Sequence, residues 1–366
     1  MDNFKIAFIA GDGIGRDVSE AAMVVAEAAC RKVEGVGLTH DEIAAGAACF
    51  METGRDIEEG GEERAGQADA IFLGAIGLPD IRHADGTEIS PHLRLRDRYG
   101  LYAGVRPVRA YPNGPQRLAD PRARTIDLVI LRESTEGLFY SAAVHGRSHV
   151  VDDERVDDIL RITRATTEKL HRFGFHLARK RKALGRSGRL TCVDKANVFR
   201  SMAFFRRIFD EISQDFPDIE TDYNYVDAMA LDCVRRPWDF DVMVMENMFG
   251  DILSDLTAAL VGGMGMASCG EIGDEIGLFQ PAHGSAPDIM GQDKANPLAS
   301  ILSAALMLDY LADKSGGTAA ARAAGAIDDA VWRGFETGRL RPMELGGDMG
   351  TRAIADEMVA LVEEGA

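Results

Sequence analysis

The sequence has too few basic residues to suggest a nucleic-acid-binding protein. It contains 41 Lys and Arg against 59 Asp and Glu, which gives a formal net charge of −18. Nucleic-acid binding depends on clusters of Lys and Arg that neutralise phosphates. The one basic run, residues 179–189, is typical of a solvated helix end that precedes a strand. We therefore expect no nucleic-acid partner.

Cysteine pairs and long apolar runs are also missing. The five cysteines form no CxxC pair and are odd in number, which fits reduced thiols better than a disulfide framework. No apolar stretch reaches the roughly 18 residues that a membrane span needs. The N-terminus lacks the basic flank and cleavage site of a signal peptide. These absences predict a cytoplasmic protein with no membrane partner.

The chain does contain a regular alternation of apolar segments and helical patterns. Strands are predicted at residues 5–10, 70–75, 126–131, 190–193 and 241–245. Helices are predicted near residues 16–31, 154–174, 199–213, 247–262 and 297–312. The 366 residues are enough for two hydrophobic cores. The alternation predicts α/β layers around a largely parallel sheet.

Two carboxylates in the segment ENMFGDILSD are the first candidate for chemistry. Asp251 and Asp255 stand four residues apart and therefore share one helix face. Their neighbours are apolar, which makes an unpaired buried carboxylate costly. A hard divalent cation such as Mg²⁺ or Mn²⁺ would remove that cost. An acidic helix face in contact with water explains the segment equally well.

Several basic side chains flank predicted strands. Arginine at a strand end can hold a carboxylate through two hydrogen bonds, although surface salt bridges are the commoner use. Lys195 lies between a predicted strand and helix, where it could act as a base or simply be solvated. Asp227 is one acid in an apolar run, so we expect it to be paired. The arginines considered are Arg94, Arg96, Arg106 and Arg132.

Two glycine-containing loops could bind phosphate. GDGIG, residues 11–15, follows the first strand but is not a GxGxxG fingerprint, because Arg16 and Val18 occupy the required glycine positions. HGSAPD, residues 283–288, offers backbone N–H groups near a helix start. The second loop is the better candidate for a phosphate cradle.

Taken together, these segments resemble the β-decarboxylating dehydrogenases, the family of isocitrate, 3-isopropylmalate, homoisocitrate and tartrate/D-malate dehydrogenases. The resemblance covers nearly the whole chain, because GDGIG, LR…VRP, RESTEG, VDKAN, YVDAMA, GDILSD and HGSAPD occur in family order. It implies an α/β fold with two domains and a large mixed sheet flanked by helices, distinct from a Rossmann fold. Residues 1–105 and 263–366 would form the large NAD-binding domain. Residues 106–262 would form the small domain, with the dimer interface and metal helix.

The resemblance also implies roles for matching residues. Asp251 and Asp255, with Asp227 of the partner subunit, match the ligands of Mg²⁺ or Mn²⁺. Lys195, also from the partner subunit, matches the base, so the enzyme would be a homodimer with shared active sites. The matches to substrate-binding positions are Arg96, Arg106, Arg132, Asn197 and Val198. The matches to NAD-binding positions are His283, Gly284, Ser285, Ala286, Asp288 and Asn296. Asp288 would repel the 2′-phosphate of NADP.

The implied activity is NAD- and metal-dependent oxidative decarboxylation of a 3-substituted malate. A 3-isopropylmalate-like substrate is favoured by Leu93 and Val198, whereas Ser90 resembles isocitrate enzymes and His92 would favour an anion. Isocitrate, homoisocitrate and tartrate or D-malate stay open as substrates. The other class of function is a non-catalytic regulatory subunit of an NAD-isocitrate dehydrogenase.

One departure concerns the acid that protonates C3 after decarboxylation. The family has a tyrosine at the position of Phe139, and a phenyl ring cannot donate a proton. Tyr140 follows it and is the candidate acid. In an extended segment Tyr140 would point away from Phe139, so a bulge or turn is needed to bring it into the site. Otherwise water or another group protonates the enolate, or the final step is changed. A second, minor departure is Gln280, where isopropylmalate enzymes have Glu.

Overall fold

The computed structural model describes residues 2–141, 149–152 and 154–365. The chain forms two compact units. The first comprises Met1–Tyr99, Tyr111–Pro115 and Gly262–Ala366, and the second comprises Gly100–Ala110 and Gln116–Val261. The expected boundary after residue 105 falls inside strand β4 (Ala103–Arg109), which belongs entirely to the second unit.

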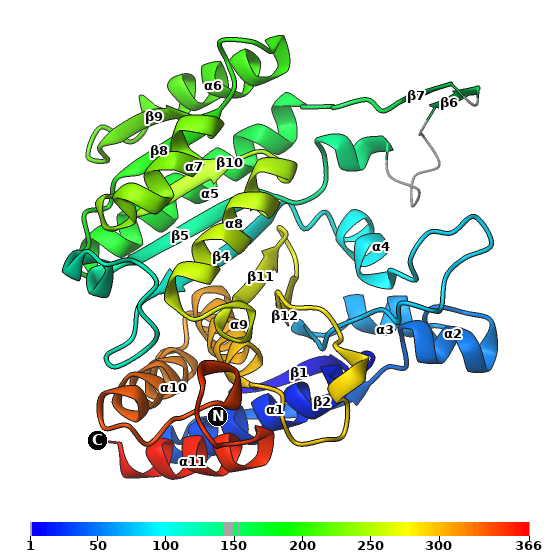
Figure 1. Cartoon of the computed structure of the whole chain (residues 1–366), viewed down its shortest axis with the longest axis vertical. Coiled ribbons are helices and arrows are strands. Elements are labelled where there is room, and N and C mark those ends of the chain that lie inside the picture. Colours follow the sequence, from blue (N-terminus) through cyan, green and yellow to red (C-terminus); the bar gives the residue numbers. More distant parts are fainter. Residues whose placement is uncertain (1, 142–148, 153, 366) are drawn as a thin grey trace. The chain divides into compact units, whose positions relative to one another are not determined.

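The first unit contains five strands of a mixed sheet. Their order is β2 (Val36–Glu42), β1 (Asp2–Ile9), β3 (Ala70–Leu73), β12 (Gly277–Pro281) and β11 (Ser268–Ile272). All neighbours are parallel except β12 and β11. The long helices are α1 (Gly15–Val33), α9 (Leu298–Ser315), α10 (Thr318–Glu336) and α11 (Thr351–Glu364), which pack on one another (Figure 1). Three short helices are α2 (Ala47–Thr53), α3 (Gly61–Gly66) and α4 (Pro91–Arg98).

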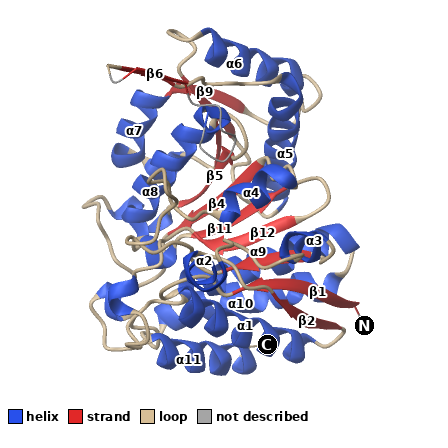
Figure 2. Ribbon diagram, turned by 90° about the vertical axis from the view of Figure 1, so that its right-hand side faces the viewer, coloured by secondary structure: helices blue, strands red, loops and turns tan. Residues whose placement is uncertain are grey.

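The second unit contains the strands β4, β5 (Asp127–Glu133), β10 (Val242–Met245), β8 (Leu190–Asp194) and β9 (Thr221–Tyr225), in that order. β4 is antiparallel to β5, and the other neighbours are parallel. The helices are α5 (Arg164–Ala183), α6 (Arg200–Ser213), α7 (Val226–Arg235) and α8 (Asn247–Val261). Figure 2 shows α5 on one side of β5 and α8 on the other. Alternation along β5 explains this, since Ile130 faces the core beneath α8 and Leu131 packs at Gly174 of α5.

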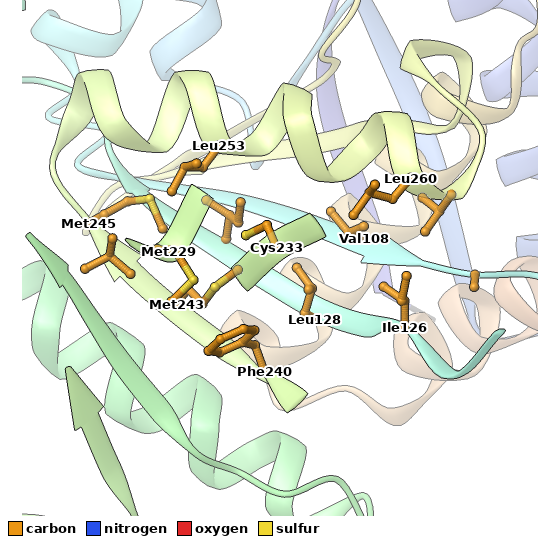
Figure 3. Packing of buried hydrophobic residues seen from close by; sticks show 14 of the residues in the cluster. Val108, Ile126, Leu128, Met229, Cys233, Phe240, Met243, Met245, Leu253 and Leu260 are labelled. Atoms are coloured by element: carbon orange, nitrogen blue, oxygen red, sulfur yellow. The ribbon is translucent and has the colours of Figure 1, made fainter. Parts of the chain in front are cut away.

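The core beneath α8 determines which face of that helix is open. Leu253 and Leu260 point from α8 onto the strands, Leu253 toward Met245 of β10 and Leu260 toward Val108 of β4 (Figure 3). With 3.6 residues per turn, burial of Leu253 directs Asp251 and Asp255 together to the opposite side of the helix. Both acids are more than half exposed. The apolar core therefore sets the position of the acidic pair.

One helix prediction was wrong at its start. The expected helix over 154–174 begins only at Arg164, and the segment before it contains strand β7 (Arg155–Asp157), antiparallel to β6 (His149–Asp152). Thr163 caps α5, because its hydroxyl accepts a hydrogen bond from the N–H of Thr166. This cap fixes the first turn ten residues later than expected. Among the described residues, no helix is both long and apolar enough to cross a membrane.

A buried histidine makes the stability of the second unit depend on pH. His171 of α5 lies between the rings of Phe205 and Phe209, and burial lowers its pKa to about 3. The unfolded chain takes up this proton near pH 6.5 and the folded chain does not, so acid favours unfolding. We expect the free energy of unfolding to fall by up to about 1.4 kcal/mol per pH unit between about pH 6.5 and 3. Chemical denaturation over this range measures the slope.

Two variants separate the titration from packing. His171→Gln removes the proton-binding group. The free energy of unfolding of this variant should therefore depend on pH less steeply than that of the wild type, by the equivalent of about one bound proton. Phe205→Leu leaves the histidine in place and should lower stability similarly at every pH. Equal slopes for the wild type and His171→Gln would show that His171 does not set the acid sensitivity.

Candidate active site

Two buried arginines meet the acidic pair of α8. Arg132 Nη1, at the end of β5, donates to Asp251 Oδ1. Arg106 Nη1, from β4, lies 3.5 Å from Asp251 Oδ1 and 4.0 Å from Asp255 Oδ1. The arginine side chains are 3% and 9% exposed, whereas those of Asp251 and Asp255 are 53% and 61% exposed. The arginines therefore form the buried floor of this site and the carboxylates form its open side.

Two further polar residues on α8 orient these arginines. Asn247 Oδ1 accepts hydrogen bonds from Arg132 Nε (3.0 Å) and Nη2 (2.6 Å). Ser254 Oγ accepts a hydrogen bond from Arg106 Nη1 at 2.6 Å. Gly250 allows the close approach, since a Cβ there would lie 2.6 Å from Cβ of Arg132. Asn247, Asp251 and Ser254 stand at positions i, i+4 and i+7 and therefore share one face of α8. This spacing is visible in the sequence and could have identified both residues.

The acidic pair has the donor chemistry of a divalent-cation site. Its oxygens are the hard ligands that Mg²⁺ and Mn²⁺ prefer. Burial raises the pKa of Asp255, the nearby Arg106 charge lowers it, and the charge of Asp251 raises it further. A cation would favour the ionised form of both acids. Within the described part of the chain, no three His, Cys, Asp or Glu side chains converge, so one chain supplies two of the three expected acids here.

The expected third acid lies elsewhere in the second unit. Asp227, in the first turn of α7, accepts a hydrogen bond from Lys195 Nζ, which holds the pKa of Asp227 below its usual range. Neither residue has a hydrogen bond or ion pair to Asp251 or Asp255 among the described contacts. Asn197 and Val198 follow Lys195 and are exposed. The structure thus brings Lys195 and Asp227 together, apart from the pair on α8.

Arg96 belongs to the first unit and is buried. Its Nη2 lies 2.9 Å from Oε1 of Glu271, a fully buried acid of β11. Within the described residues, Arg96 Nε is a buried donor without a hydrogen-bond partner, which suits an anionic ligand. Ser90 precedes α4, and His92 and Leu93 lie in its first turn, all half-buried.

Arg94 has a different environment from Arg96. Its Nη1 and Nη2 donate to the two carboxylate oxygens of Asp56 at 2.7 and 2.9 Å. Its Nε donates to Glu62. This two-pronged ion pair joins α4 to the segment before α3, so Arg94 serves the structure of the first unit.

The loop of residues 283–288 is held against the GDGIG turn. The N–H of Ile14 donates to the carbonyl of Ser285 at 2.7 Å. Asn296 is buried and donates to Oε2 of Glu344 at 3.0 Å, while Asp288 is exposed in a short 3-10 turn. Burial lowers the pKa of His283, and its Nε2 has no partner among the described residues. A buried imidazole nitrogen without a partner, beside exposed backbone, suits a polar ligand such as a nucleotide.

Comparison with known proteins decides the family. A family model described as isocitrate/isopropylmalate dehydrogenase matches residues 5–362. This chain belongs to that family. The 3-isopropylmalate/3-methylmalate dehydrogenase of Methanocaldococcus jannaschii is 38% identical over 363 residues, which cover 98% of this chain and 99% of that protein. Homoisocitrate dehydrogenase of the same organism is 37% identical over 370 residues, 98% of each chain.

The fold of the isocitrate/isopropylmalate dehydrogenase family is confirmed by a solved relative. The crystal structure of isocitrate dehydrogenase from Methylococcus capsulatus matches with a TM-score of 0.84 at 33% identity, over 99% of this chain and 100% of that chain. The predicted α/β fold with a mixed sheet and flanking helices is therefore confirmed. The chain is a β-decarboxylating hydroxyacid dehydrogenase, as the sequence predicted.

The segment at the family's tyrosine position is a 3-10 turn. Leu138–Ser141 form this turn, so Tyr140 does not lie in an extended segment. Phe139 lies with its ring centroid 5.5 Å from the Arg132 guanidinium carbon, and Tyr140 lies 4.4 Å from that of Arg161. The turn that Tyr140 requires is present, but it is Phe139 whose ring covers the substrate-binding candidate Arg132.

Proposed function

We propose that this enzyme catalyses the NAD- and divalent-metal-dependent oxidative decarboxylation of a 3-substituted malate with an alkyl group at C3. The observation that carries the proposal is the pair of buried arginines that face two open carboxylates on α8. Arginines suit the carboxylates of a malate, and the paired acids suit a hard cation. The five cysteines form no disulfide, which fits a reducing compartment, so we place the enzyme in the cytoplasm.

The enzyme acts as a homodimer in this proposal. Exposed apolar side chains on α7, α8 and the loop after β8 support it, namely Leu231, Val234, Ile252, Val198 and Phe199. Large apolar side chains exposed on neighbouring elements are typical of protein–protein interfaces. Lys195 and Asp227 lie in the same region of the chain and are paired with each other. We infer that they complete the site of the other subunit.

Each binding group has a defined task. Arg106 and Arg132, with Arg96, hold the malate carboxylates. Asp251 and Asp255, with Asp227 of the partner subunit, hold the cation. The dinucleotide lies along His283, Gly284, Ser285, Ala286, Asp288 and Asn296, where the carboxylate of Asp288 favours ribose hydroxyls over a 2′-phosphate. When bound, the cation would supply polarisation of the C2 oxygen, and NAD would supply the acceptor for the C2 hydride.

Two side chains move protons in this mechanism. Lys195 of the partner subunit accepts the proton of the C2 hydroxyl as the C2–H bond breaks. The C3–carboxylate bond then breaks with release of CO₂. Its electrons form a C2–C3 double bond while the electrons of the C2 carbonyl move to oxygen, which gives an enolate. Tyr140 donates the proton that C3 requires. The buried arginines exclude water from the carboxylates and hold C2 and C3 in place.

An alkyl substituent is favoured because Leu93 and Val198 are apolar and match the pocket positions. The 3-isopropylmalate/3-methylmalate dehydrogenase and the homoisocitrate dehydrogenase of Methanocaldococcus jannaschii are 38% and 37% identical to this chain. Overall sequence similarity therefore does not distinguish between their substrates. NADH formation with Mg²⁺ or Mn²⁺ tests the proposal against 3-isopropylmalate, isocitrate, homoisocitrate, D-malate and tartrate. We expect the highest kcat/KM with 3-isopropylmalate. No turnover of any of the five would refute the proposed activity.

The proton donor is tested by exchanging the two adjacent ring residues. Tyr140→Phe should lower kcat for decarboxylation about 10- to 100-fold, because a positioned acid is lost. In that background Phe139→Tyr should restore much of the rate, since residue 139 lies over Arg132. Assays should compare NADH formed with CO₂ released. An unchanged rate in Tyr140→Phe would mean that another group or water protonates C3.

A further inference from the structure

Asp12 of the GDGIG turn is a buried carboxylate that contacts neither the arginines nor the acids of the active site. It is 2% exposed. Its Oδ2 accepts hydrogen bonds from the N–H groups of Ala47 and Gly77, both at 2.8 Å, and its Oδ1 accepts one from Ala48 at 2.9 Å. All three donors are backbone N–H groups, for which a carboxylate is a strong acceptor. Asp12 thereby joins the start of α2 to the turn that follows β3.

The backbone at Gly77 also holds the loop of residues 283–288. The carbonyl of Gly77 accepts a hydrogen bond from the hydroxyl of Ser285, and the carbonyl of Ser285 accepts one from the N–H of Ile14. Gly13 has a φ of 55°, and Ser285 fills the space that a side chain at residue 13 would need. Three turns from distant parts of the sequence therefore meet at Asp12 and Ser285.

Apolar packing reinforces this arrangement on its other side. Ile14, Val18 and Ala295 form a small buried cluster, against which Ala286 and Ile289 pack. Ala286 has a φ of 35°, which an alanine adopts only where its surroundings hold it. The loop conformation thus depends on contacts made by the neighbouring turns. The Asp12 carboxylate, which accepts three hydrogen bonds, holds these turns together.

We propose that Asp12 is a positioning residue for dinucleotide binding, which acts through Gly77 and Ser285 to preorganise the loop of residues 283–288. The proposal rests on the proposed function, which places NAD at this loop. A loop that is already in its binding conformation loses less entropy when the ligand binds. Loss of the carboxylate should therefore weaken cofactor binding more than it affects binding of metal by the α8 acids.

The test measures the Kd of NADH by calorimetry for the full-length enzyme. Asp12→Asn places an NH₂ group among three N–H donors and should raise this Kd about 10-fold or more. Ser285→Ala removes the hydroxyl that donates to Gly77 and should raise the Kd about 3- to 10-fold, whereas Ser285→Thr keeps the hydroxyl and should restore binding. In the double variant Asp12→Asn/Ser285→Ala, the Kd should match that of Asp12→Asn alone, because both act through one chain of contacts. Mn²⁺ affinity should be unchanged in all of them.

Asp17→Asn is the matched control, because Asp17 lies on the adjacent helix and accepts a surface hydrogen bond from the N–H of Gly291 at 3.0 Å. Its NADH affinity should change less than about twofold. If Ser285→Ala binds NADH as the wild type does, the proposal is overturned, whether or not Asp12→Asn folds. Absence of NADH binding by the wild type would instead refute the cofactor assignment of the proposed function.

Discussion

Replacement of Asp251 by Asn is expected to lower metal-dependent kcat/KM by at least about 10³-fold, or about 4 kcal/mol in the barrier. Asp251 is the carboxylate that both Arg132 and Arg106 approach, and it shares the open face of α8 with Asp255. An amide keeps the size of the side chain but loses its charge. The substitution should therefore remove cation affinity and the carboxylate charge that faces Arg132 and Arg106.

The measurement pairs steady-state NADH formation with direct titration of Mn²⁺. The control is Asp329→Asn on α10, an exposed acid whose only described ion pair is with Arg333 of the same helix. It should leave both quantities within about twofold of the wild type. Full activity of Asp251→Asn at saturating Mn²⁺ would contradict the metal assignment on α8.

Local patterns predicted the acidic pair because its information lies within one helix turn. The spacing of Asp251 and Asp255 and the apolar residues between them are visible in ten residues of sequence. Asn247 and Ser254 follow the same spacing and could have been included. Asp12 could not, because its amide partners lie 35 to 65 residues away and carry no side-chain signal. Long-range hydrogen bonds to backbone leave no periodic trace in a sequence.

The fold shows the same division between local and distant causes. Strands such as β8 and β10 are apolar runs and were predicted, as was the amphipathic helix α6. Strand β11, SCGEI, was missed although all five of its residues are buried. Its Glu271 is paired with the buried Arg96, a residue 175 positions earlier in the chain. A polar strand buried by such a pairing cannot be distinguished from a loop by its own composition.

Mixing two inactive variants should restore activity if the active sites are shared between subunits. In a heterodimer of Lys195→Met and Asp251→Asn, one site receives the intact Asp251 of the first chain and the intact Lys195 of the second. The other site carries both defects. After random reassortment, half of the dimers are heterodimers with one functional site of two, so activity should reach about a quarter of the wild-type value. Each homodimer alone should be inactive.

The structure motivates this experiment because Lys195 is paired with Asp227 and not with the acids on α8 of its own chain. If all catalytic groups came from one chain, every site of the heterodimer would carry one defect, and mixing would restore nothing. The control mixes Lys195→Met with Asp227→Asn, because both residues are proposed to be supplied to the site of the other subunit. Each of the two sites in that heterodimer lacks one of these groups, so the heterodimer should stay inactive. Recovery in the first mixture but not in the second would assign Lys195 and Asp227 to the partner's site.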